Sequence, residues 1–288
     1  MADESSFKSL EFRKVAFAIA FSPRLDAILS EAERMQKMLN CYLVLIHIGS
    51  KNSGKEQELE AKLAERELPA EKREVIWESG NPANEILEIC HKEQVDLLVM
   101  GALQRESLLS YYIGSVARKI CRKGDFSIML LTEPANNPVP VKKMVVSAPE
   151  HPKTGCTLST ALTLAELYNT EEVFLVRESS MYGFAKMIRE SSSEESNKFE
   201  QEFIDQENEN LNKVLNSVKE SKIKISTRVV GGKPGYEIAK FARRKGANLL
   251  VVNSPDSKLG VIDRFFPHDL EHVLADLPCS LLIVHPSE

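Results

Sequence analysis

An internal repeat constrains the fold of this chain more than any other feature of its sequence. The stretch GNPANEILEICHKEQVDLLVMG, from Gly80, aligns without a gap with GKPGYEIAKFARRKGANLLVVN, from Gly232. Identical residues stand 152 positions apart at Gly80, Pro82, Glu85, Ile86, Leu97, Leu98 and Val99 of the first copy. Each copy has the pattern of a turn, a helix and a buried strand. The chain is therefore expected to contain one fold twice.

The segments around this repeat also correspond. KVAFAIAFSP (14–23) resembles KMVVSAPEHP (143–152), and LVLIHI (43–48) resembles VFLVRE (173–178). Strands that alternate with helices predict parallel βαβ units. The near-continuous apolar runs LLVM and LLVV predict a sheet that is covered on both faces. We therefore predict an α/β protein of two tandem doubly wound, Rossmann-like domains, each a five-stranded parallel sheet with helices on both faces.

The segment TEPANNPVPVKK is rich in proline and asparagine and is a natural joint, so the domains are predicted at 1–137 and 138–288. The second domain carries an acidic, serine-rich insertion, RESSSEESN (189–197), which is expected to be a solvated loop. A long amphipathic helix is expected after it, with apolar positions at Phe199, Phe203, Leu211, Val214, Leu215 and Val218.

Composition limits the classes of partner. A net charge of -5 over 288 residues argues against a general electrostatic grip on nucleic acid or on an anionic membrane. No apolar run approaches the ~20 residues that span a bilayer, and MADESSFKS lacks the pattern of a signal peptide. The cysteines are odd in number and never spaced C-x-x-C, which predicts free thiols in a reducing compartment. We expect a cytoplasmic protein.

The stretch VMGALQRESLLSYYIGSVARK (99–119) lies where this architecture places a ligand. Ligands of open parallel sheets bind beyond the carboxyl ends of the strands, where the strand order reverses. The loops after Ile19 and Met100 meet this condition. The second loop runs from the end of a strand to the start of a helix and contains Gly101 and a Gly114-Ser115 pair.

The strand-turn IAFSP, the helix start G-x-P-x-x-E-I and VMG…GSV before a final helix, in this order and in tandem, resemble the universal stress protein family. Members that bind ATP carry G-x2-G-x9-G-(S/T) after the fourth strand and an Asp in the first turn. The resemblance implies that the base is lined by apolar strand ends, the ribose lies beside the first glycine, and backbone N–H groups at a helix start hold phosphate. The positions concerned are Ile19, Ala20, Ile48, Met100, Gly101, Gln104, Gly114, Ser115 and Val116.

Two of these positions depart from the family pattern. Gln104 replaces the middle glycine, and its Cβ restricts both close approach to phosphate and positive φ. Ala20 replaces the Asp and removes a hydrogen-bond acceptor from the nucleoside side. We predict ATP or another adenine nucleotide, with Mg²⁺ if ATP is bound, in the first domain only. The alternative is that Gly114-Ser115 merely starts a helix that Ser115 caps.

The motif is more degraded in the second domain. Asn253 and Asp256 stand in place of the first two glycines, and Pro267-His268 replaces the Gly-Ser pair. Proline has no N–H to offer a phosphate. No nucleotide is therefore expected in the second domain.

Two rival motifs stay open. GSKNSGKE (49–56) fits G-x-x-x-x-G-K, but Glu56 stands where Ser or Thr would ligate Mg²⁺, so a flexible polar loop is the simpler interpretation. His268 and His272 can share one helix face, but a zinc site needs a further ligand. His47 ends an apolar strand and is expected to be packed. No spacing demands a nucleophile.

These patterns favour a non-catalytic stress-response protein that binds nucleotide in its first domain. The alternative is a nucleotide-free interaction scaffold, or a binder of another small ligand in a remodelled cleft. A third hypothesis is a P-loop ATP hydrolase. The resemblance also implies an internal pseudo-dimer through Ser127–Leu131 and Ser280–Val284, which would cover an apolar edge, with a homodimer left open.

Overall fold

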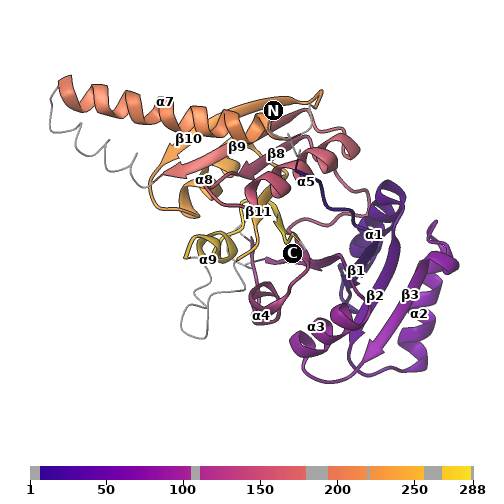
Figure 1. Ribbon diagram of the computed structural model, residues 1–288. Helices are drawn as coiled ribbons and strands as arrows, with labels where there is room; N and C mark the ends of the chain where they lie inside the picture. The colour runs from indigo at the N-terminus through magenta and orange to yellow at the C-terminus, as the bar shows by residue number, and fades with distance from the viewer. Residues whose placement is uncertain (1–6, 105–110, 180–193, 219–220, 256–267, 287–288) are drawn as a thin grey trace. The chain divides into compact units, whose positions relative to one another are not determined.

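The computed structural model describes residues 7–104, 111–179, 194–218, 221–255 and 268–286 (Figure 1). The chain forms two compact units. The first comprises residues 11–140. The second comprises residues 141–286 together with Phe7–Leu10, so the chain passes between the units after Leu10 and again after Pro140.

The first unit contains a five-stranded parallel sheet in the order β7-β4-β1-β2-β3. Its strands are β1 (Lys14–Ala18), β2 (Tyr42–Ile48), β3 (Arg73–Glu78), β4 (Leu97–Gly101) and β7 (Ser127–Leu131). Its helices are α1 (Leu25–Leu39), α2 (Ser53–Ala64), α3 (Pro82–Lys92) and α4 (Ser115–Lys123), with a 3-10 turn at Ala70–Lys72.

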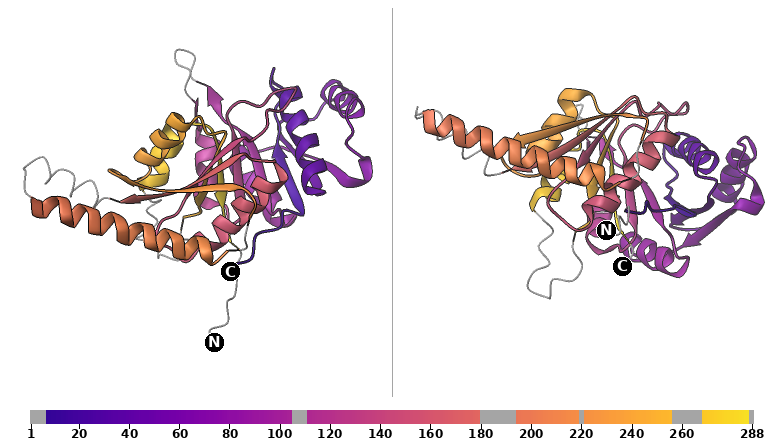
Figure 2. Two further views of the ribbon diagram at one scale, coloured as in Figure 1. Left: turned by 90° about the horizontal axis from the view of Figure 1, so that it is seen from above. Right: turned by 45° about the horizontal axis from the view of Figure 1, so that its top comes forward.

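The second unit repeats this plan in the order β10-β9-β8-β11-β12. Its strands are β8 (Lys143–Ser147), β9 (Glu172–Ser179), β10 (Lys224–Gly231), β11 (Leu249–Asn253) and β12 (Ser280–Val284). Its helices are α5 (Thr154–Leu167), α7 (Glu194–Asn216), α8 (Tyr236–Lys245) and α9 (His268–Ala275). Figure 2 shows this sheet between the orange α7 on one side and the gold α8 on the other. The predicted pair of five-stranded, doubly wound domains is confirmed.

The central strands of both sheets are buried on both faces, as their continuous apolar sequences predict. Leu97, Leu98 and Val99 of β4 are fully buried, and so are Leu250 and Val251 of β11. Strand β4 pairs with β1, and β11 pairs with β8. Strand order reverses at these two pairs. After β1 the next strand, β2, lies on one side of the pair, and after β4 the next strand of the sheet, β7, lies on the other side; β9 and β12 flank the pair of β8 and β11 in the same way.

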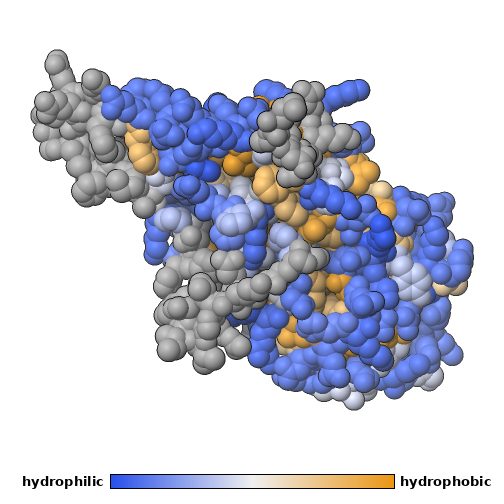
Figure 3. All heavy atoms as spheres, in the orientation of Figure 1, coloured by the Kyte–Doolittle hydropathy of each residue, from blue (hydrophilic) through white to orange (hydrophobic). Residues whose placement is uncertain are grey.

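Helix α7 corrects one prediction from the sequence. The insertion 189–197 was expected to be a loop, but α7 begins at Glu194, inside it. Acidic residues such as Glu194 and Glu195 suit the first turn of a helix because they complement its dipole. The buried side of α7 carries Leu211, as predicted, and its outward side is hydrophilic (Figure 3). The side chains of 194–200, including Phe199, lie outside the described residues.

Two further expectations concern the described residues as a whole. The five cysteines are free thiols, as predicted; Cys156 is half-buried and the other four are buried. Within the described ranges, every helix is too short or too polar to cross a membrane.

Candidate functional site

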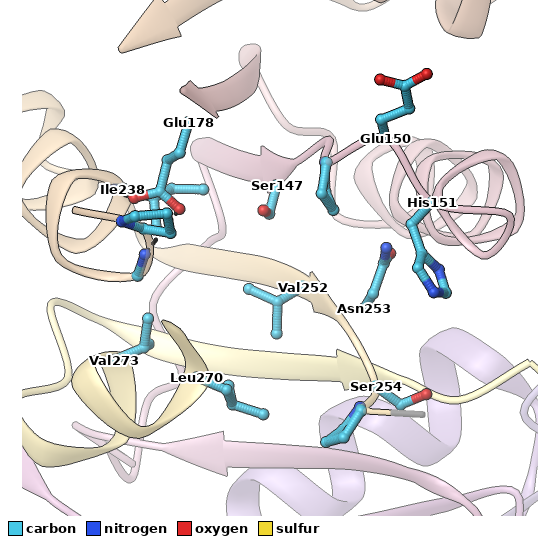
Figure 4. Close-up of a pocket in the computed structure, with 14 residues that line it drawn as sticks. Ser147, Glu150, His151, Glu178, Ile238, Val252, Asn253, Ser254, Leu270 and Val273 are labelled. Carbon is cyan, nitrogen blue, oxygen red and sulfur yellow. Dashed lines mark hydrogen bonds between the residues drawn. The ribbon is translucent and has the colours of Figure 1, made fainter. Parts of the chain in front are cut away.

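The second unit contains a cavity of about 290 Å³ at the carboxyl ends of β8, β9 and β11 (Figure 4). It therefore opens at the reversal of strand order, where an open parallel sheet binds its ligand. The side chains of Val252, Leu270 and Val273 give it an apolar wall. The other lining residues are Ser147, Pro149, Glu150, His151, Glu178, Pro234, Gly235, Ile238, Asn253, Ser254 and Pro255.

Asn253 lines this cavity and has one polar atom without a hydrogen-bond partner among the described residues. It ends β11 at the position that Gly101 occupies in β4. Its Nδ2 donates to Thr154 Oγ1 at 3.1 Å. Its Oδ1 is buried and has no hydrogen-bond partner among the described residues. A buried acceptor without a donor is costly.

Glu178 stands at the end of β9 and caps helix α8. Its carboxylate accepts hydrogen bonds from Gly235 N (2.9 Å) and Ile238 N (2.8 Å). These N–H groups at a helix start would otherwise attract an anion. Because Glu178 already occupies them, the start of α8 offers little to a phosphate.

Lys153 and His151 follow β8, and their polar groups also take part in hydrogen bonds within the unit. Lys153 Nζ donates to Ser254 O (3.3 Å), Ser254 Oγ (3.1 Å) and Pro255 O (2.9 Å), which uses its three protons. The Lys153 backbone N–H donates to His151 Nδ1 at 3.2 Å. A neutral His151 ring therefore carries its proton on Nε2, and Nδ1 cannot be oriented by a carboxylate as a catalytic base requires.

In the first unit, the sequence-predicted nucleoside residues lie together at the carboxyl edge of β1, β2 and β4. Ile19 and Met100 are buried, Ile48 and Gly101 are half-buried, and Ala20 is exposed. Ile19 N donates to Ile46 O at 2.8 Å and extends the pairing of β1 with β2. The structure thus brings these five positions to one edge of the sheet.

The predicted phosphate loop of the first unit contains a short antiparallel pair that the sequence did not predict. Strand β5 (Leu103–Gln104) pairs with β6 (Tyr111–Tyr112). The Gln104 side chain lies outside the described residues. Strand pairing favours aromatic residues such as the two tyrosines of β6, which explains the pairing of β5 with β6.

Helix α4 starts differently from the alternative interpretation. Gly114, rather than Ser115, is its N-cap residue, and Ser115 and Val116 are its first helical residues. Its N-cap residue is a glycine with no side chain to cap the helix, and its first turn has no acidic residue. A Cβ on Gly114 would lie 3.0 Å from Leu103 Cδ1. The predicted phosphate positions therefore form a helix start beside an apolar side chain.

In each unit a basic residue links the loop after the first strand to the loop after the fourth strand, and the sequence did not reveal it. Arg24 Nη1 donates to Ala102 O at 2.8 Å. Lys153, its counterpart in the repeat, donates to Ser254 O. Each follows the proline of the first-strand turn and contacts the residue after the fourth strand. The aligned pairs Pro23-Arg24 and Pro152-Lys153 were the available signal.

His47 is packed, as predicted, with a relative exposure of 6%. Its Nδ1 lies 3.2 Å from Ile19 O, and its ring makes edge contacts with Phe21 and Trp77 at centroid distances of 4.9 Å each. Arg177 holds the same position in the second unit, where Nε donates to Ala148 O and Nη1 pairs with Glu207 Oε2, both at 2.9 Å.

The rival motifs gain no support. Asn52 caps α2, and its Oδ1 accepts the Lys55 N–H at 2.9 Å, so this amide of the would-be P-loop is used. The Lys55 ammonium lies over the Phe21 ring, 5.3 Å from its centroid. The side chain of His268, and Asp256 and Pro267 entirely, lie outside the described residues. The described part of the chain holds no cluster of three or more metal-ligating side chains.

The fold defines a tandem doubly wound α/β protein. A model of the universal stress protein family matches residues 49–131 and 142–285. Because these ranges cover more than half of the sequence, the chain belongs to the universal stress protein family. The match at two ranges confirms the tandem arrangement.

Known proteins agree with this assignment. A universal stress protein of Methanocaldococcus jannaschii is 34% identical over 55 residues, which are 19% of this chain and 32% of that protein. The chain thus spans about a third of that relative's length. Solved structures share the fold over nearly the whole chain. A putative universal stress protein of Pseudomonas aeruginosa has a TM-score of 0.69 and 14% identity, with 95% and 93% of the two chains covered. A universal stress protein of Archaeoglobus fulgidus has a TM-score of 0.63 and 14% identity, with 96% and 99% covered.

Proposed function

We propose that this protein is a non-catalytic small-ligand-binding protein and that the cavity of its second unit takes an uncharged adenine nucleoside. The buried Asn253 Oδ1 is the observation that carries this proposal, because it lacks a donor among the described residues. The exocyclic amine of adenine and the hydroxyls of ribose are such donors. Adenine is the ligand class that the family resemblance implies, and family membership extends the proposal to a stress-response role in the cytoplasm.

The size of the cavity and its bonding groups support a nucleoside over a nucleotide. About 290 Å³ is at the lower end of ligand pockets, which suits a compact molecule. The two groups suited to a phosphate, the start of α8 and the Lys153 ammonium, already bond Glu178 and the Ser254–Pro255 segment. The Glu150 carboxylate is turned away from the cavity (Figure 4). A phosphate there would lose its hydration, while the start of α8 and the Lys153 ammonium already bond groups of the protein.

A second candidate places an adenine nucleotide in the first unit, at the positions predicted from the sequence. One observation favours it: the N-cap residue of α4 is Gly114, which has no side chain to cap the helix, and the first turn has no acidic residue. Such a helix start attracts anions. This candidate predicts the opposite preference, with nucleotides bound more tightly than nucleosides.

The proposal of a non-catalytic role has a specific basis. The cavity contains Ser147, Ser254, His151 and two carboxylates, which are the residue types of a hydrolytic triad. His151 Nδ1 is used by the Lys153 N–H, however, and Glu178 caps α8. Neither residue is left in the arrangement that activates a serine.

The experiment starts with the purified protein, which is denatured so that any released small molecule can be identified by mass spectrometry. Adenosine, AMP and ATP are then added to the emptied and refolded protein in a melting assay. Adenosine should raise the melting temperature, and Asn253→Leu should abolish the shift while Gly114→Lys leaves it intact. If ATP raises the melting temperature and Gly114→Lys removes this effect, the binding site lies in the first unit. No shift with any of the three would contradict adenine binding.

A further inference from the structure

Residues Phe7–Leu10 pack on the second unit although they precede the first unit in sequence. Phe7 N donates to Ser217 O at 3.3 Å, beyond the end of α7. Leu10 N donates to Thr160 Oγ1 at 3.0 Å, on α5. We call this segment the strap. The chain enters the first unit at Glu11, so the strap is one of the two chain connections between the units.

Gly155 in the first turn of α5 forms the seat of the strap. The Phe7 ring lies so close to its Cα that a Cβ on Gly155 would overlap the ring. The corresponding residue of α1 is Asp26, which bonds Lys62 and Arg66 of the first unit instead. Glycine is a poorer helix former than alanine. Its presence here is explained by the room that Phe7 needs.

The strap and the ligand cavity lie on two sides of one loop. A second hollow of about 360 Å³ is lined by Phe7, Gly155 and Val214, and also by Pro149, Glu150 and His151. The last three residues also line the ligand cavity. The loop after β8 therefore forms a wall of both hollows. A displacement of this loop from the side of the strap also changes the wall of the ligand cavity.

Hydrogen bonds join the two sides. Asn253 Nδ2 donates to Thr154 Oγ1, and the Thr154 hydroxyl donates to Pro149 O at 2.8 Å. Thr154 is 1% exposed and directly precedes Gly155. The path therefore runs from the cavity wall through Thr154 to the wall loop and to the seat of Phe7.

We propose that the strap is held through Thr154 and that it responds to occupation of the cavity. A donor on Asn253 Oδ1 would fix the amide with Nδ2 toward Thr154. This orientation holds Thr154, the Pro149 carbonyl and the Gly155 seat in place, so a bound ligand tightens the strap. The ligand part of this inference rests on the proposed function. By linkage, loss of the strap weakens ligand binding by the same factor.

Trypsin cleavage after Lys8, an exposed residue of the strap, measures its release in the full-length protein. Mass spectrometry identifies the peptide that ends at Lys8. Gly155→Ala should make cleavage faster by about tenfold or more, because an opened segment is cut in proportion to its open population. Alanine favours the helix over glycine, which offsets the lost Phe7 packing, so the melting temperature should change little. Phe7→Ala should raise cleavage in the same way without any change to α5.

The path is tested with a matched pair of threonines on α5. Thr154→Val removes the hydroxyl that links Asn253 to Pro149. Thr163→Val removes a hydroxyl that donates only to Ser159 O at 3.0 Å, away from the path. Thr154→Val should speed cleavage after Lys8 several-fold, and Thr163→Val should leave it at the wild-type rate. Equal rates for these two variants, or a wild-type rate for Gly155→Ala, would overturn the inference.

Adenosine at a saturating concentration should slow cleavage of the wild type and have no effect on cleavage of Thr154→Val. If adenosine raises the melting temperature but leaves cleavage unchanged, the coupling is wrong and the proposed function stands. If adenosine does not bind, the proposed function fails, and the threonine pair still decides whether the strap is held through Thr154.

Discussion

The two units share one backbone plan and differ in what fills equivalent positions around the crevice. His47 in the first unit and Arg177 in the second are both buried, and each contacts the carbonyl of the residue after the first strand, at Ile19 and Ala148. His47 packs in a cluster of rings, whereas Arg177 pairs with Glu207 on α7. The scaffold thus fixes a donor at this point and leaves the surrounding chemistry free to diverge.

The fourth strand shows what this divergence means for binding. Gly101 ends β4 and matches the family motif, whereas Asn253 ends β11 and breaks it. The unit with the broken motif contains a cavity of about 290 Å³, lined in part by Asn253, whose Oδ1 has no partner among the described residues. Under the proposed function, a lost phosphate motif accompanies a change in the ligand that fits and does not by itself mark the loss of a site.

Loss of the buried Arg177–Glu207 ion pair of the second unit should have the largest effect on the free energy of unfolding. Arg177→Leu is expected to lower the free energy of unfolding by about 3–5 kcal/mol, because it leaves the Glu207 carboxylate and the Ala148 carbonyl without their donor. Urea denaturation measures this loss. Arg228→Leu on β10 removes an exposed arginine as the control and should cost about 0.5 kcal/mol or less. Equal losses of unfolding free energy in the two variants would show that the Arg177–Glu207 pair stabilises the protein no more than an exposed arginine does.

Exchange of the strand-end residues tests the comparison directly. Asn253→Gly installs the first unit's residue in the second and removes the acceptor. We expect affinity for adenosine to fall about tenfold or more, as for a lost hydrogen bond to a buried group. Equilibrium titration measures the effect, and Gly101→Asn is the reciprocal variant that should leave adenosine binding unchanged. Unaltered affinity in Asn253→Gly would remove Asn253 from the site.

Asp26, the counterpart of Gly155, should have a smaller and pH-dependent effect. Its hydrogen bonds with Lys62 and then Arg66 lower the pKa of its carboxyl from 3.8. A lowered folded-state pKa contributes stability above the unfolded value, and this contribution is lost as the pH falls through the folded value. The side chain is 40% exposed, so Asp26→Asn should cost only about 1 kcal/mol at pH 7. In denaturation at several pH values, the difference from wild type should shrink below pH 3.8; a difference that grows there would contradict the assignment.

The rates of thiol labelling should distinguish the cysteines from one another; this prediction involves no change in stability. Burial raises the pKa of Cys90 and Cys279 to about 12 and that of Cys41 to about 11. Thiolate, the reactive form, is therefore scarce at pH 8. Half-buried Cys156 should react first with a thiol reagent, and Cys156→Ser should remove this fast phase. Fast reaction that persists in Cys156→Ser would show that a buried thiol opens to solvent.

The fold could be predicted from the sequence because the signals are local and occur twice. Apolar runs such as LLVM and LLVV and the repeated helix starts predict strands, helices and their order. The cavity could not be predicted, because it depends on how β8, β9 and β11 bring separate side chains together. The same holds for Arg24 and Lys153, whose partners are backbone carbonyls far along the chain. The Phe7–Gly155 contact joins opposite halves of the chain and has no local pattern.

The proposed site in the second unit is tested most directly by calorimetric titration of the emptied protein with adenosine, AMP and ATP at one salt concentration. We predict that adenosine binds, that affinity falls as each phosphate is added, and that Asn253→Leu abolishes binding while Gly114→Lys does not. Affinity that rises from adenosine to ATP and is lost in Gly114→Lys would contradict this account and return the site to the first unit.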